Sequence, residues 1–592
     1  MTHILSEITI RNFKSIINET FELSAFTPLV GYNNAGKSNM LEAIKWLLKK
    51  TALTDAAFYD KNQAVEMEGK ISGISPAILD QLPDNQRTAI QPFLIDNGLF
   101  IKRIQALPNV GVAQIRLLVK DTAQIGTVNE WRANPVGLDQ AIQALFPEPI
   151  HIGAMENSEE DVSKNKTTTT IGKLLAEILG PLQNNYNARV QNALEDVKRL
   201  LDADGEDRAP ELTAFDTAVN EKVGSFFPGV CIKVHVPTPE LKEVFSKGTI
   251  KVFENLNPEG RDVSALGHGT QRSIQMALVR HLADIKREAG EQASNTILLI
   301  DEPELYLHPQ AIEVLRDALK TLSEQGYQVI FSTHSPFTIT SKDVENTILI
   351  RKNNDQGTHK RHSLKSAITA VAAAHPSQLS IVFSLSNSSN ILFAEKVVLA
   401  EGKTENRLLP KIIQKVSGKT LGLHKIALVP IDGSGSTKKT IEVLTAMAIP
   451  TKAIVDLDYA LKESEREGFL LVGDIDVLAI KTHLATIAPA HSINLNNGWP
   501  TKTGSVLTAA EAFRMLAQEV AIQVNLSNLK AKLKAHGIYV WTKGAIEEHL
   551  GRIPKNEIGW AAFNSRLETE ELNVILPDDH NEITDLVTWL IN

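Results

Sequence analysis

The chain has 592 residues, enough for about three to five domain-sized units. Its 61 Lys and Arg against 70 Asp and Glu give a net charge of −9, which excludes a uniformly basic nucleic-acid coat but not a local basic groove. A single cysteine, Cys231, excludes intramolecular disulfides and multi-cysteine zinc sites. The start MTHILSEITIRN lacks the pattern of a signal peptide, and no apolar run reaches about 18 residues, so we expect a cytoplasmic protein without membrane contact.

The first fifty residues predict a strand, a glycine-rich loop and a helix in succession. TPLVG is typical of a buried strand that ends in a turn, and the apolar spacing from Asn39 to Lys50 predicts a helix. Between them, Gly31–Ser38 reads GYNNAGKS and matches the phosphate-loop pattern G-x-x-x-x-G-K-[ST]. Lys37 would reach the β- and γ-phosphates, and the Ser38 hydroxyl would bind Mg²⁺. The competing interpretation is a glycine turn without a ligand.

The middle of the chain predicts a helical insertion and a second glycine-rich loop. Residues 155–225 have the spacing of one or two amphipathic helices, which either pack into the core or form a dimer contact. CIKVHV and GTIKVFE then predict strands. LGHGTQRS, from Leu266 to Ser273, places glycines before a helix and so predicts an anion-binding helix N-terminus.

Two apolar strands of parallel type follow, and each ends in polar residues. TILLID leads to Asp301 and Glu302, and YQVIFST leads to His334. Asp301 would hold Mg²⁺ through water, Glu302 would polarise the attacking water, and His334 would contact the γ-phosphate. Taken alone, the acidic pair also fits a helix cap, and the histidine fits a structural role.

The phosphate loop, the glycine-rich signature LGHGTQRS, the acidic strand end and His334 follow one another in this order. Together they resemble the ABC-type ATPase heads of the SMC and recombination-repair group, where GKSN followed by LEAI is familiar. The resemblance implies an ATP sandwich between the phosphate loop of one protomer and the signature of another, and hence a homodimer or larger assembly. The signature departs from the common LSGGQ at His268. The nucleotide-binding residues implied are Gly31, Asn34, Gly36, Lys37, Ser38, Asn39, Asp301, His334, Gly267, Gly269 and Gln271, with Ser38 and Asp301 as metal ligands and Glu302 catalytic.

Carboxylates gather at strand ends in the last third of the chain. VVLAEGKTE places Glu401 at a strand end and Glu405 four residues on; KAIVDLD places Asp456 and Asp458 on one side of a strand. WTKGAIEEHL spaces Lys543 and Glu547 to face together if helical. Such acids would repel one another without a divalent cation, and oxygen ligands favour Mg²⁺ or Mn²⁺ over zinc. A solvated strand end, a helix N-terminal charge effect and a surface ion pair are the competing interpretations.

Together these carboxylates resemble the TOPRIM domain, and Lys543–Glu547 resembles its nuclease branch. The order of the two domains resembles the OLD (overcoming lysogenisation defect) family of ATP-dependent nucleases, including the large subunit of Gabija-type or retron-associated antiphage systems. The resemblance covers about residues 1–120, 230–340 and 390–550. It implies metal binding by Glu401, Glu405, Asp456, Asp458 and Glu547, with Glu401, Asp456 and Lys543 catalytic; Asp474, Asp476 and Glu511 stay unassigned.

We therefore expect an α/β chain: an ABC-type ATPase domain with a mixed sheet and flanking helices over 1–350, a linker over 351–390, and a TOPRIM nuclease domain with a parallel sheet over 391–592. ATP and Mg²⁺ (or Mn²⁺) would be the cofactors, and two metals would cleave the phosphodiester. The basic stretches Arg351–Lys365 and Lys530–Lys534 would follow a nucleic-acid backbone, unless they are solvated faces.

DNA is the expected substrate and antiphage defence the expected role, possible partners being an accessory helicase or a reverse transcriptase with its RNA. RNA or tRNA cleavage in a toxin-like effector, and a non-nuclease repair ATPase, are the alternatives. A primase would need a cysteine-rich zinc unit, which one cysteine excludes. A topoisomerase would need a further domain for its tyrosine, and only 42 residues follow Leu550.

Overall fold

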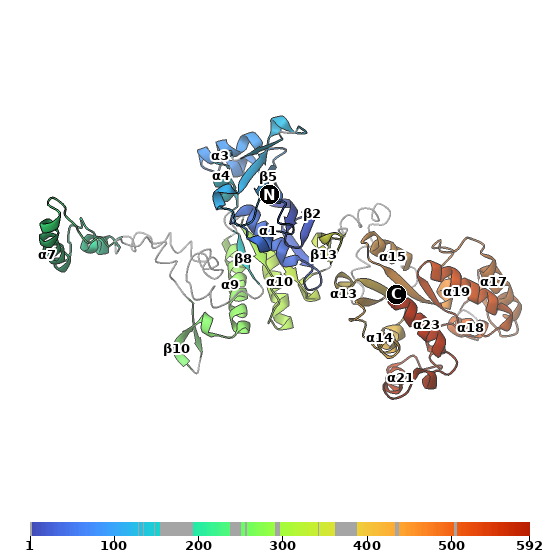
Figure 1. The fold of residues 1–592 in the computed structure, drawn as a ribbon. Helices are drawn as coiled ribbons and strands as arrows, with labels where there is room; N and C mark the ends of the chain where they lie inside the picture. The colour runs from blue at the N-terminus through green and yellow to red at the C-terminus, as the bar shows by residue number, and fades with distance from the viewer. Residues whose placement is uncertain are drawn as a thin grey trace. The chain divides into compact units, whose positions relative to one another are not determined.

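The computed structural model describes residues 3–127, 130–133, 135–146, 149–153, 192, 194–236, 250–254, 257–289, 296–340, 343–361, 388–431, 437–501 and 506–592. The chain divides into two units (Figure 1). Unit 1 comprises Met1–Leu29, Gly36–Thr338 and Asn353–Thr358, and unit 2 comprises Val30–Ala35, Ile339–Lys352 and His359–Asn592.

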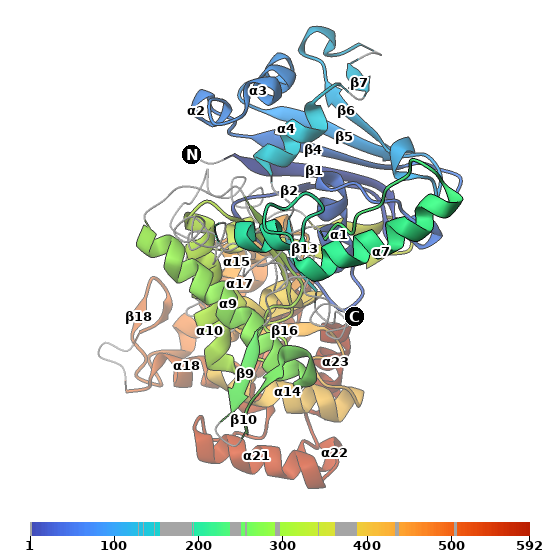
Figure 2. The same cartoon turned by 90° about the vertical axis from the view of Figure 1, so that its left-hand side faces the viewer.

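The first part of unit 1 is an antiparallel sheet with the strand order β7-β6-β5-β4-β1-β2-β14. In β4 every second residue is buried, so the strand presents one face to a core and the other to solvent. The helices α3 and α4 lie side by side near this sheet (Figure 2). The strands are β1 (Ile4–Phe13), β2 (Ile16–Glu22), β4 (Val65–Ser72), β5 (Leu99–Gln105), β6 (Arg116–Lys120), β7 (Trp131–Ala133) and β14 (Gly357–Lys360).

The second part of unit 1 carries the strands in the order β3-β12-β11-β8: β3 (Phe26–Val30), β12 (Gln328–Thr333), β11 (Ile297–Ile300) and β8 (Ile150–Ile152). β11 pairs in parallel with both β12 and β8. Every residue of β11 and β12 is buried, as expected for parallel strands covered on both faces. Their carboxyl ends meet at one edge of the sheet, where Asp301 and His334 follow.

Among the described residues, the helices of unit 1 include α1 (Lys37–Leu48), α2 (Pro76–Leu79), α3 (Asp84–Ile90), α4 (Leu138–Leu145), α7 (Pro210–Phe226), α9 (His268–Ala289) and α10 (Pro309–Glu324). The strands β9 (Lys251–Glu254) and β10 (Asn257–Asp262) form a hairpin. Much of the predicted insertion over 155–225, namely residues 155–191 and 193, lies outside the described residues; residues 194–201 are helical, and α7 follows them. The prediction of a strand at Cys231–Val236 is wrong. The N–H groups of Ile232 and Val234 donate to Asn220 and Asp216 of α7, so no neighbouring strand receives them.

Unit 2 is built on a parallel sheet with the order β16-β15-β17-β20. Alternate residues of each strand enter two separate cores: Val397 and Leu399 pack in one, and Val398 in the other. The strands are β15 (Lys396–Ala400), β16 (Ile426–Pro430), β17 (Thr451–Asp456) and β20 (Ile538–Trp541). The predicted α/β class, with a mixed sheet followed by a parallel one, is confirmed.

Helices cover both faces of this parallel sheet (Figure 1). They are α13 (Ser388–Phe393), α14 (Lys403–Ser417), α15 (Thr437–Ala446), α16 (Leu457–Lys462), α17 (Ile475–Ile487), α18 (Ala509–Leu516), α19 (Gln523–Ala535), α20 (Ile546–His549), α21 (Glu557–Thr569), α22 (Leu572–Ile575) and α23 (His580–Ile591); short strands are β13 (Ile348–Asn353), β18 (Leu495–Asn496) and β19 (Trp499–Pro500). Most of the predicted linker, residues 362–387, lies outside the described residues. Within the described ranges, no helix combines the length and apolar character that crossing a membrane needs.

Candidate active sites

The predicted phosphate loop connects the buried strand β3 to α1, as the sequence indicates. Gly36 at the N-cap has a φ of 105°, and an added Cβ there would lie 2.2 Å from Thr358 Oγ1, so only glycine fits. No side chain caps α1, which leaves its N-terminus suited to an anion. Asn34 also has a positive φ, of 65°, while the Asn39 amide donates to Ser15 Oγ at 2.6 Å.

Asp301 is the point at which three elements of unit 1 meet. The residue follows β11 and is 9% exposed, and its N–H donates to Ile152 O of β8. The Ser38 hydroxyl donates to Asp301 Oδ2 at 2.6 Å, and the Ser332 hydroxyl of β12 donates to Oδ1. The hydroxyl and carboxylate predicted to share a magnesium ion therefore already lie together.

His334 lies between the two other charged groups predicted for the nucleotide site. Lys37 Nζ lies 2.8 Å from His334 Nε2, and Glu302 Oε1 lies 3.3 Å from the same nitrogen. Burial and then the Lys37 charge lower the pKa of His334, which favours the neutral imidazole as acceptor from the lysine. Glu302 has a positive φ of 49°, held by its N–H bond to Ser332 Oγ at 3.0 Å.

Two residues of this site were not predicted from the sequence. Arg272, buried in α9, donates from Nη2 to the carbonyl oxygens of Asp301 and Glu302, both at 2.7 Å. Glu304 accepts from the His334 N–H at 2.7 Å and from Thr333 Oγ1 at 2.8 Å, and burial raises its pKa. Arg272 directly follows Gln271 within LGHGTQRS, and Glu304 is the third acid of DEPE, so both stood in or beside motifs already recognised.

The predicted signature forms the start of α9. Gly267 precedes the helix, and Gly269 lies in its first turn. Gln271 is 5% exposed and donates from Nε2 to Leu266 O at 2.7 Å, which shapes the loop. Through Arg272, the same helix turn is fixed to the acidic strand end.

The predicted carboxylates of unit 2 come together at the carboxyl ends of β15 and β17. Glu401, Asp456 and Asp458 each place a carboxylate oxygen within 4.8 Å of the others. The Asp456 N–H donates to Glu401 Oε2 at 3.0 Å. The expected strand geometry is wrong, because β17 ends at Asp456 and Asp458 lies in the first turn of α16. The start of a helix, and not strand alternation, brings the two aspartates together.

Glu405 and Glu547 lie deeper at the same edge. Glu405, in the first turn of α14, is 2% exposed and accepts from Trp541 Nε1 at 3.0 Å. An added Cβ on Gly402 would lie 2.5 Å from Glu405 Oε2, which explains the glycine. Glu547 of α20 is 7% exposed and accepts from Thr404 Oγ1 at 2.5 Å.

Electrostatics shows that these acids form one group with Asp456 at its centre. Burial raises the pKa of Asp456 well above its usual value, and Glu405, Glu401 and Asp458 raise it further. Burial likewise raises the pKa of Glu401, and burial together with Glu547 raises that of Glu405 to about 7. Buried carboxylates that resist ionisation fit divalent cations, which would replace the missing solvation.

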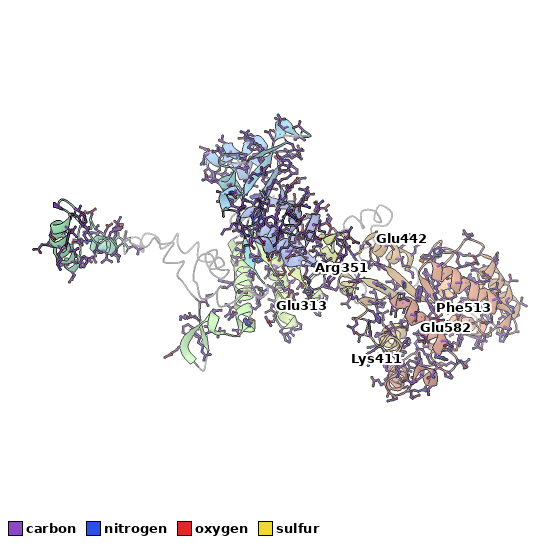
Figure 3. All side chains as sticks on the ribbon, viewed as in Figure 1. Glu313, Arg351, Lys411, Glu442, Phe513 and Glu582 are labelled. Carbon is purple, nitrogen blue, oxygen red and sulfur yellow. The ribbon has the colours of Figure 1, made fainter. Side chains whose placement is uncertain are left out.

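The lysine next to this cluster is Lys555, not the predicted Lys543. Lys543 Nζ lies 2.5 Å from Asp579 Oδ1, in a separate group with His549 and Glu582 (Figure 3 labels Glu582). Lys555 Nζ lies 3.4 Å from Glu547 Oε1, and Glu547 and Asp456 raise its pKa although burial acts to lower it. Lys555 stands twelve residues beyond Lys543 in a loop without a motif, so the sequence carried no signal for it.

Several other charged residues have structural partners. Asp474 caps α17 and, with Asp476, pairs with Lys532; Glu511 closes the capping box of α18 with Thr508. The unassigned acids therefore do not join the carboxylate cluster.

Residues 362–365 of the first predicted basic stretch lie outside the described residues, and several described cations of the two stretches have partners within the chain. Lys530 binds Glu582 and the Tyr539 hydroxyl, and Lys532 binds the two aspartates of α17. Arg351, which Figure 3 labels, is 6% exposed and donates to Ala394 O. Such contacts do not favour the prediction that these stretches follow a nucleic-acid backbone.

The group of His549, Asp579 and Glu582 also has carboxylate and imidazole atoms close enough for a metal ion. Lys543 already pairs with Asp579, and Lys530 pairs with Glu582. Although burial acts to lower it, these two acids raise the pKa of His549, as in an ion-pair network. With two lysines balancing its acids, the group is a structural network.

Comparisons with known proteins identify an ATPase domain and a TOPRIM domain in the chain. A family model described as an AAA ATPase domain matches residues 4–93 and 119–339, and one described as an overcoming lysogenization defect protein-like TOPRIM domain matches 392–458. The Old nuclease of Escherichia phage P2 is 39% identical over 604 residues, covering 100% of both chains. Endonuclease GajA of Bacillus cereus is 25% identical over 425 residues, covering 69% of this chain and 68% of its own.

Among solved structures, an Smc head domain from Pyrococcus furiosus with an extended coiled coil is 15% identical with a TM-score of 0.37, covering 63% of this chain and 99% of that one. The family assignment follows from the full-length relative and the two domain models. The chain belongs to the OLD nuclease family, and its ATPase and TOPRIM domains make it an ATP-dependent endonuclease that uses a divalent metal.

Proposed function

We propose that the chain cleaves DNA with two Mg²⁺ (or Mn²⁺) ions held by the carboxylates of unit 2. Glu401, Asp456 and Asp458 would hold one ion, since their oxygens lie within 4.8 Å of one another. Asp456, Glu405 and Glu547 would hold the other, because Asp456 interacts with Glu405 and Glu405 with Glu547. When bound, such ions activate water and stabilise the leaving oxygen. The central position of Asp456 is the observation that carries this proposal.

Lys555 is the chain's own cation at this site. Its ammonium group lies 3.4 Å from Glu547, and its side chain is 59% exposed, so it can reach both the acids and a substrate. An ammonium there would neutralise charge at the scissile phosphate. Lys543 was predicted for that role from its motif. Because Lys543 pairs with Asp579, it is the weaker candidate for contacting the scissile phosphate.

In unit 1, the phosphates of ATP would bind the α1 N-terminus and Lys37. Mg²⁺ would bind Ser38 and Asp301, which are already hydrogen-bonded to each other. Glu302 would then polarise the attacking water, and His334, freed from Lys37, would contact the γ-phosphate.

The signature supports a homodimer or larger assembly. Gly267 and Gly269 precede or begin a long helix whose N-terminus favours an anion. A second protomer would bring these glycines to the nucleotide bound on Lys37. Light scattering with and without nucleotide tests this, and a strictly monomeric mass in both conditions contradicts it.

We further propose a cytoplasmic antiphage role with an accessory subunit as partner, as the sequence resemblance to antiphage effectors implies; the similarity to the endonuclease GajA supports the nuclease activity that this role needs. Plaque counts with cells that carry the intact gene or the Asp456→Asn variant test it. Protection that depends on Asp456 supports the role, and equal plaque counts for both contradict it.

The cleavage assay incubates the purified full chain with supercoiled DNA or with tRNA, in the presence of ATP and Mg²⁺. We expect nicking of DNA that chelator abolishes, and that Glu401→Gln and Asp456→Asn abolish while ATP turnover continues. Asp474→Asn is the matched control, because Asp474 caps α17 and pairs with Lys532 outside the cluster. Cleavage that survives in both cluster variants would place the nuclease elsewhere. Cleavage of tRNA alone would favour the RNA-directed alternative.

A further inference from the structure

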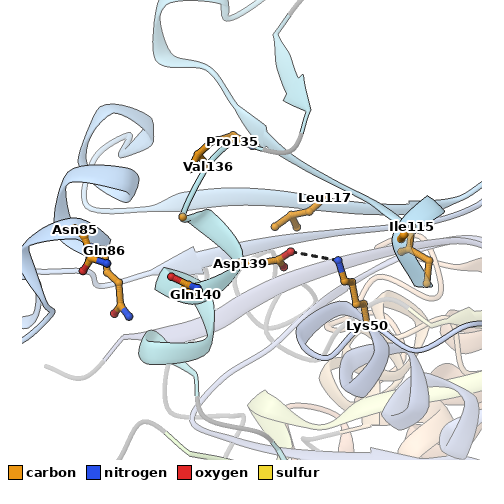
Figure 4. A pocket seen from close by; sticks show the side chains of 11 residues that line it. Lys50, Asn85, Gln86, Ile115, Leu117, Pro135, Val136, Asp139 and Gln140 are labelled. Atoms are coloured by element: carbon orange, nitrogen blue, oxygen red, sulfur yellow. Dashed lines mark hydrogen bonds and ion pairs between the residues drawn. The ribbon is translucent and has the colours of Figure 1, made fainter. Parts of the chain in front are cut away.

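Unit 1 contains a cavity of about 520 Å³ at the end of α1 opposite the phosphate loop (Figure 4). Lys50 lines it two residues after α1 ends, whereas Lys37 begins the same helix. Because a helix of 12 residues is about 18 Å long, the cavity is distinct from the ATP site. Its volume lies in the range typical of pockets for small organic ligands.

Lys50 and Asp139 line one side of the cavity, and Arg103, which does not line it, contacts the same carboxylate. Asp139 lies 3.6 Å from Lys50 Nζ and 3.6 Å from Arg103 Nη2, so two cations share one carboxylate. Arg103 is 1% exposed, and its Nη1 has no hydrogen-bond partner within the described part of the chain. Leu117 lines the cavity and is the direct cross-strand partner of Arg103, which puts both side chains on one face of the sheet.

The start of α4 lies beside this ion-pair group, and its first turn carries Asp139. The helix runs from Leu138 to Leu145, its N-cap Gly137 lines the cavity, and no side chain caps it. First-turn N–H groups and the helix dipole favour a negatively charged group at this position. Lys50 faces the same turn through Asp139, as Figure 4 shows. The combination indicates an anionic ligand group.

The rest of the wall offers amides and apolar side chains. Asn85, Gln86 and Gln140 carry amides, which can both donate and accept, and Gln86 Oε1 is buried with no hydrogen-bond partner in the described chain. Ile115 and Val136 provide apolar surface, and Val136 is 96% exposed at the rim. A flat heteroaromatic ring with donors and acceptors on its edge would satisfy both kinds of group.

We propose that this cavity binds a nucleoside monophosphate unit, with the phosphate at Lys50 and the α4 N-terminus and the base between Val136 and the amides of Gln86 and Gln140. The site is separate from both catalytic centres and does not depend on the roles proposed for them. A free nucleotide and the phosphorylated end of a nucleic-acid strand offer the same chemistry. Arg103 Nε also donates to Leu47 O at 2.9 Å, which joins the ion-pair group beside the cavity to the last turn of α1.

The test is calorimetric titration of the full chain in a Lys37→Ala background, which weakens binding at the phosphate loop. The probes are AMP, GMP, CMP and UMP, the nucleosides without phosphate, and an oligonucleotide with a 5′-phosphate. At least one monophosphate should bind with one site per chain, and its nucleoside about tenfold or more weakly. Competition by the oligonucleotide identifies a strand end as the source, and its absence identifies a free nucleotide.

Variants locate the binding site. Lys50→Met and Gln140→Leu should each weaken monophosphate binding about tenfold or more, since each removes a charged or polar contact. Lys61→Met is the matched control, because Lys61 pairs with Asp55 on the surface and does not line the cavity. Thermal unfolding of each variant verifies that it is folded. Absence of monophosphate binding, or binding unchanged in both cavity variants, overturns the proposal, as does displacement by an acidic peptide but by no nucleotide.

Discussion

Replacing Glu405 by Gln should stabilise the metal-free protein at alkaline pH. Burial, followed by the charge of Glu547, raises the pKa of Glu405 from 4.5 to about 7. Such a rise corresponds to about 3 kcal/mol between the two protonation states. The protonated acid is favoured in the fold, so its stabilising contribution is complete below about pH 4.5 and is lost as the pH rises through about 7. Gln keeps an acceptor for Trp541 Nε1 and carries no charge.

The assay is thermal unfolding in chelator at about pH 8 and at about pH 4.5. At the higher pH, Glu405→Gln should unfold at a temperature about 5–10 °C above that of the wild type, and at the lower pH the difference should vanish. Mg²⁺ should stabilise the wild type more than the variant, because the variant lacks a ligand. Glu568→Gln is the control, since Glu568 is exposed and pairs with Lys411. A variant less stable than the wild type in chelator at about pH 8 would refute the reasoning.

Three further predictions concern the catalytic residues. Lys37→Ala should weaken ATP binding about 10- to 100-fold, measured by calorimetry, because a charge-assisted contact to phosphate is lost. Glu302→Gln should bind ATP normally and lose turnover about 100-fold or more; ATPase rates near those of the wild type would remove Glu302 from its role. Lys555→Gln should slow single-turnover DNA cleavage about 100-fold or more, while Lys543→Gln should affect thermal stability more than cleavage. If Lys543→Gln slowed cleavage more than Lys555→Gln does, the motif-based assignment of Lys543 as the catalytic lysine would be restored.

Sequence motifs located both sites because each depends on residues close together along the chain. The phosphate loop needs Gly36 at a positive φ directly before α1, and this requirement is visible in eight consecutive letters. Glu401 and Asp456 follow apolar strands, and parallel strands bring their carboxyl ends to one edge. For the same reason, Asp301 and His334 were found at the ends of β11 and β12.

The residues that the motifs missed act from elsewhere in the chain. Arg272 reaches the carbonyl oxygens of Asp301 and Glu302 from α9, a contact between residues about thirty positions apart that no local pattern encodes. The prediction of a strand at Cys231–Val236 is wrong for a similar reason, because side chains of α7 accept hydrogen bonds from two of its backbone N–H groups. The periodicity of a segment predicts its preferred secondary structure, but hydrogen-bond partners from other parts of the chain determine the structure that it adopts.

The two lysines show the same limit within the nuclease site. Spacing placed Lys543 with Glu547 on the assumption that a helix spans both, but α20 begins at Ile546, so Lys543 lies in the turn before it and reaches Asp579. Lys555 lies in the loop before α21. The negative charges of Glu547 and Asp456 act on its ammonium group and raise its pKa. Because the three carboxylates of Glu405, Glu401 and Asp458 surround Asp456, the ammonium group of Lys555 lowers their mutual repulsion. A bound metal ion would lower the repulsion instead, so that Lys555 could contact the substrate phosphate.

Metal binding and the Lys555 contact to Glu547 should therefore oppose each other. Lys555→Gln should bind Mg²⁺ more tightly at about pH 8 than the wild type does, as calorimetry can measure. Weaker Mg²⁺ binding by the variant would show that Lys555 supports the ions instead of standing in for them.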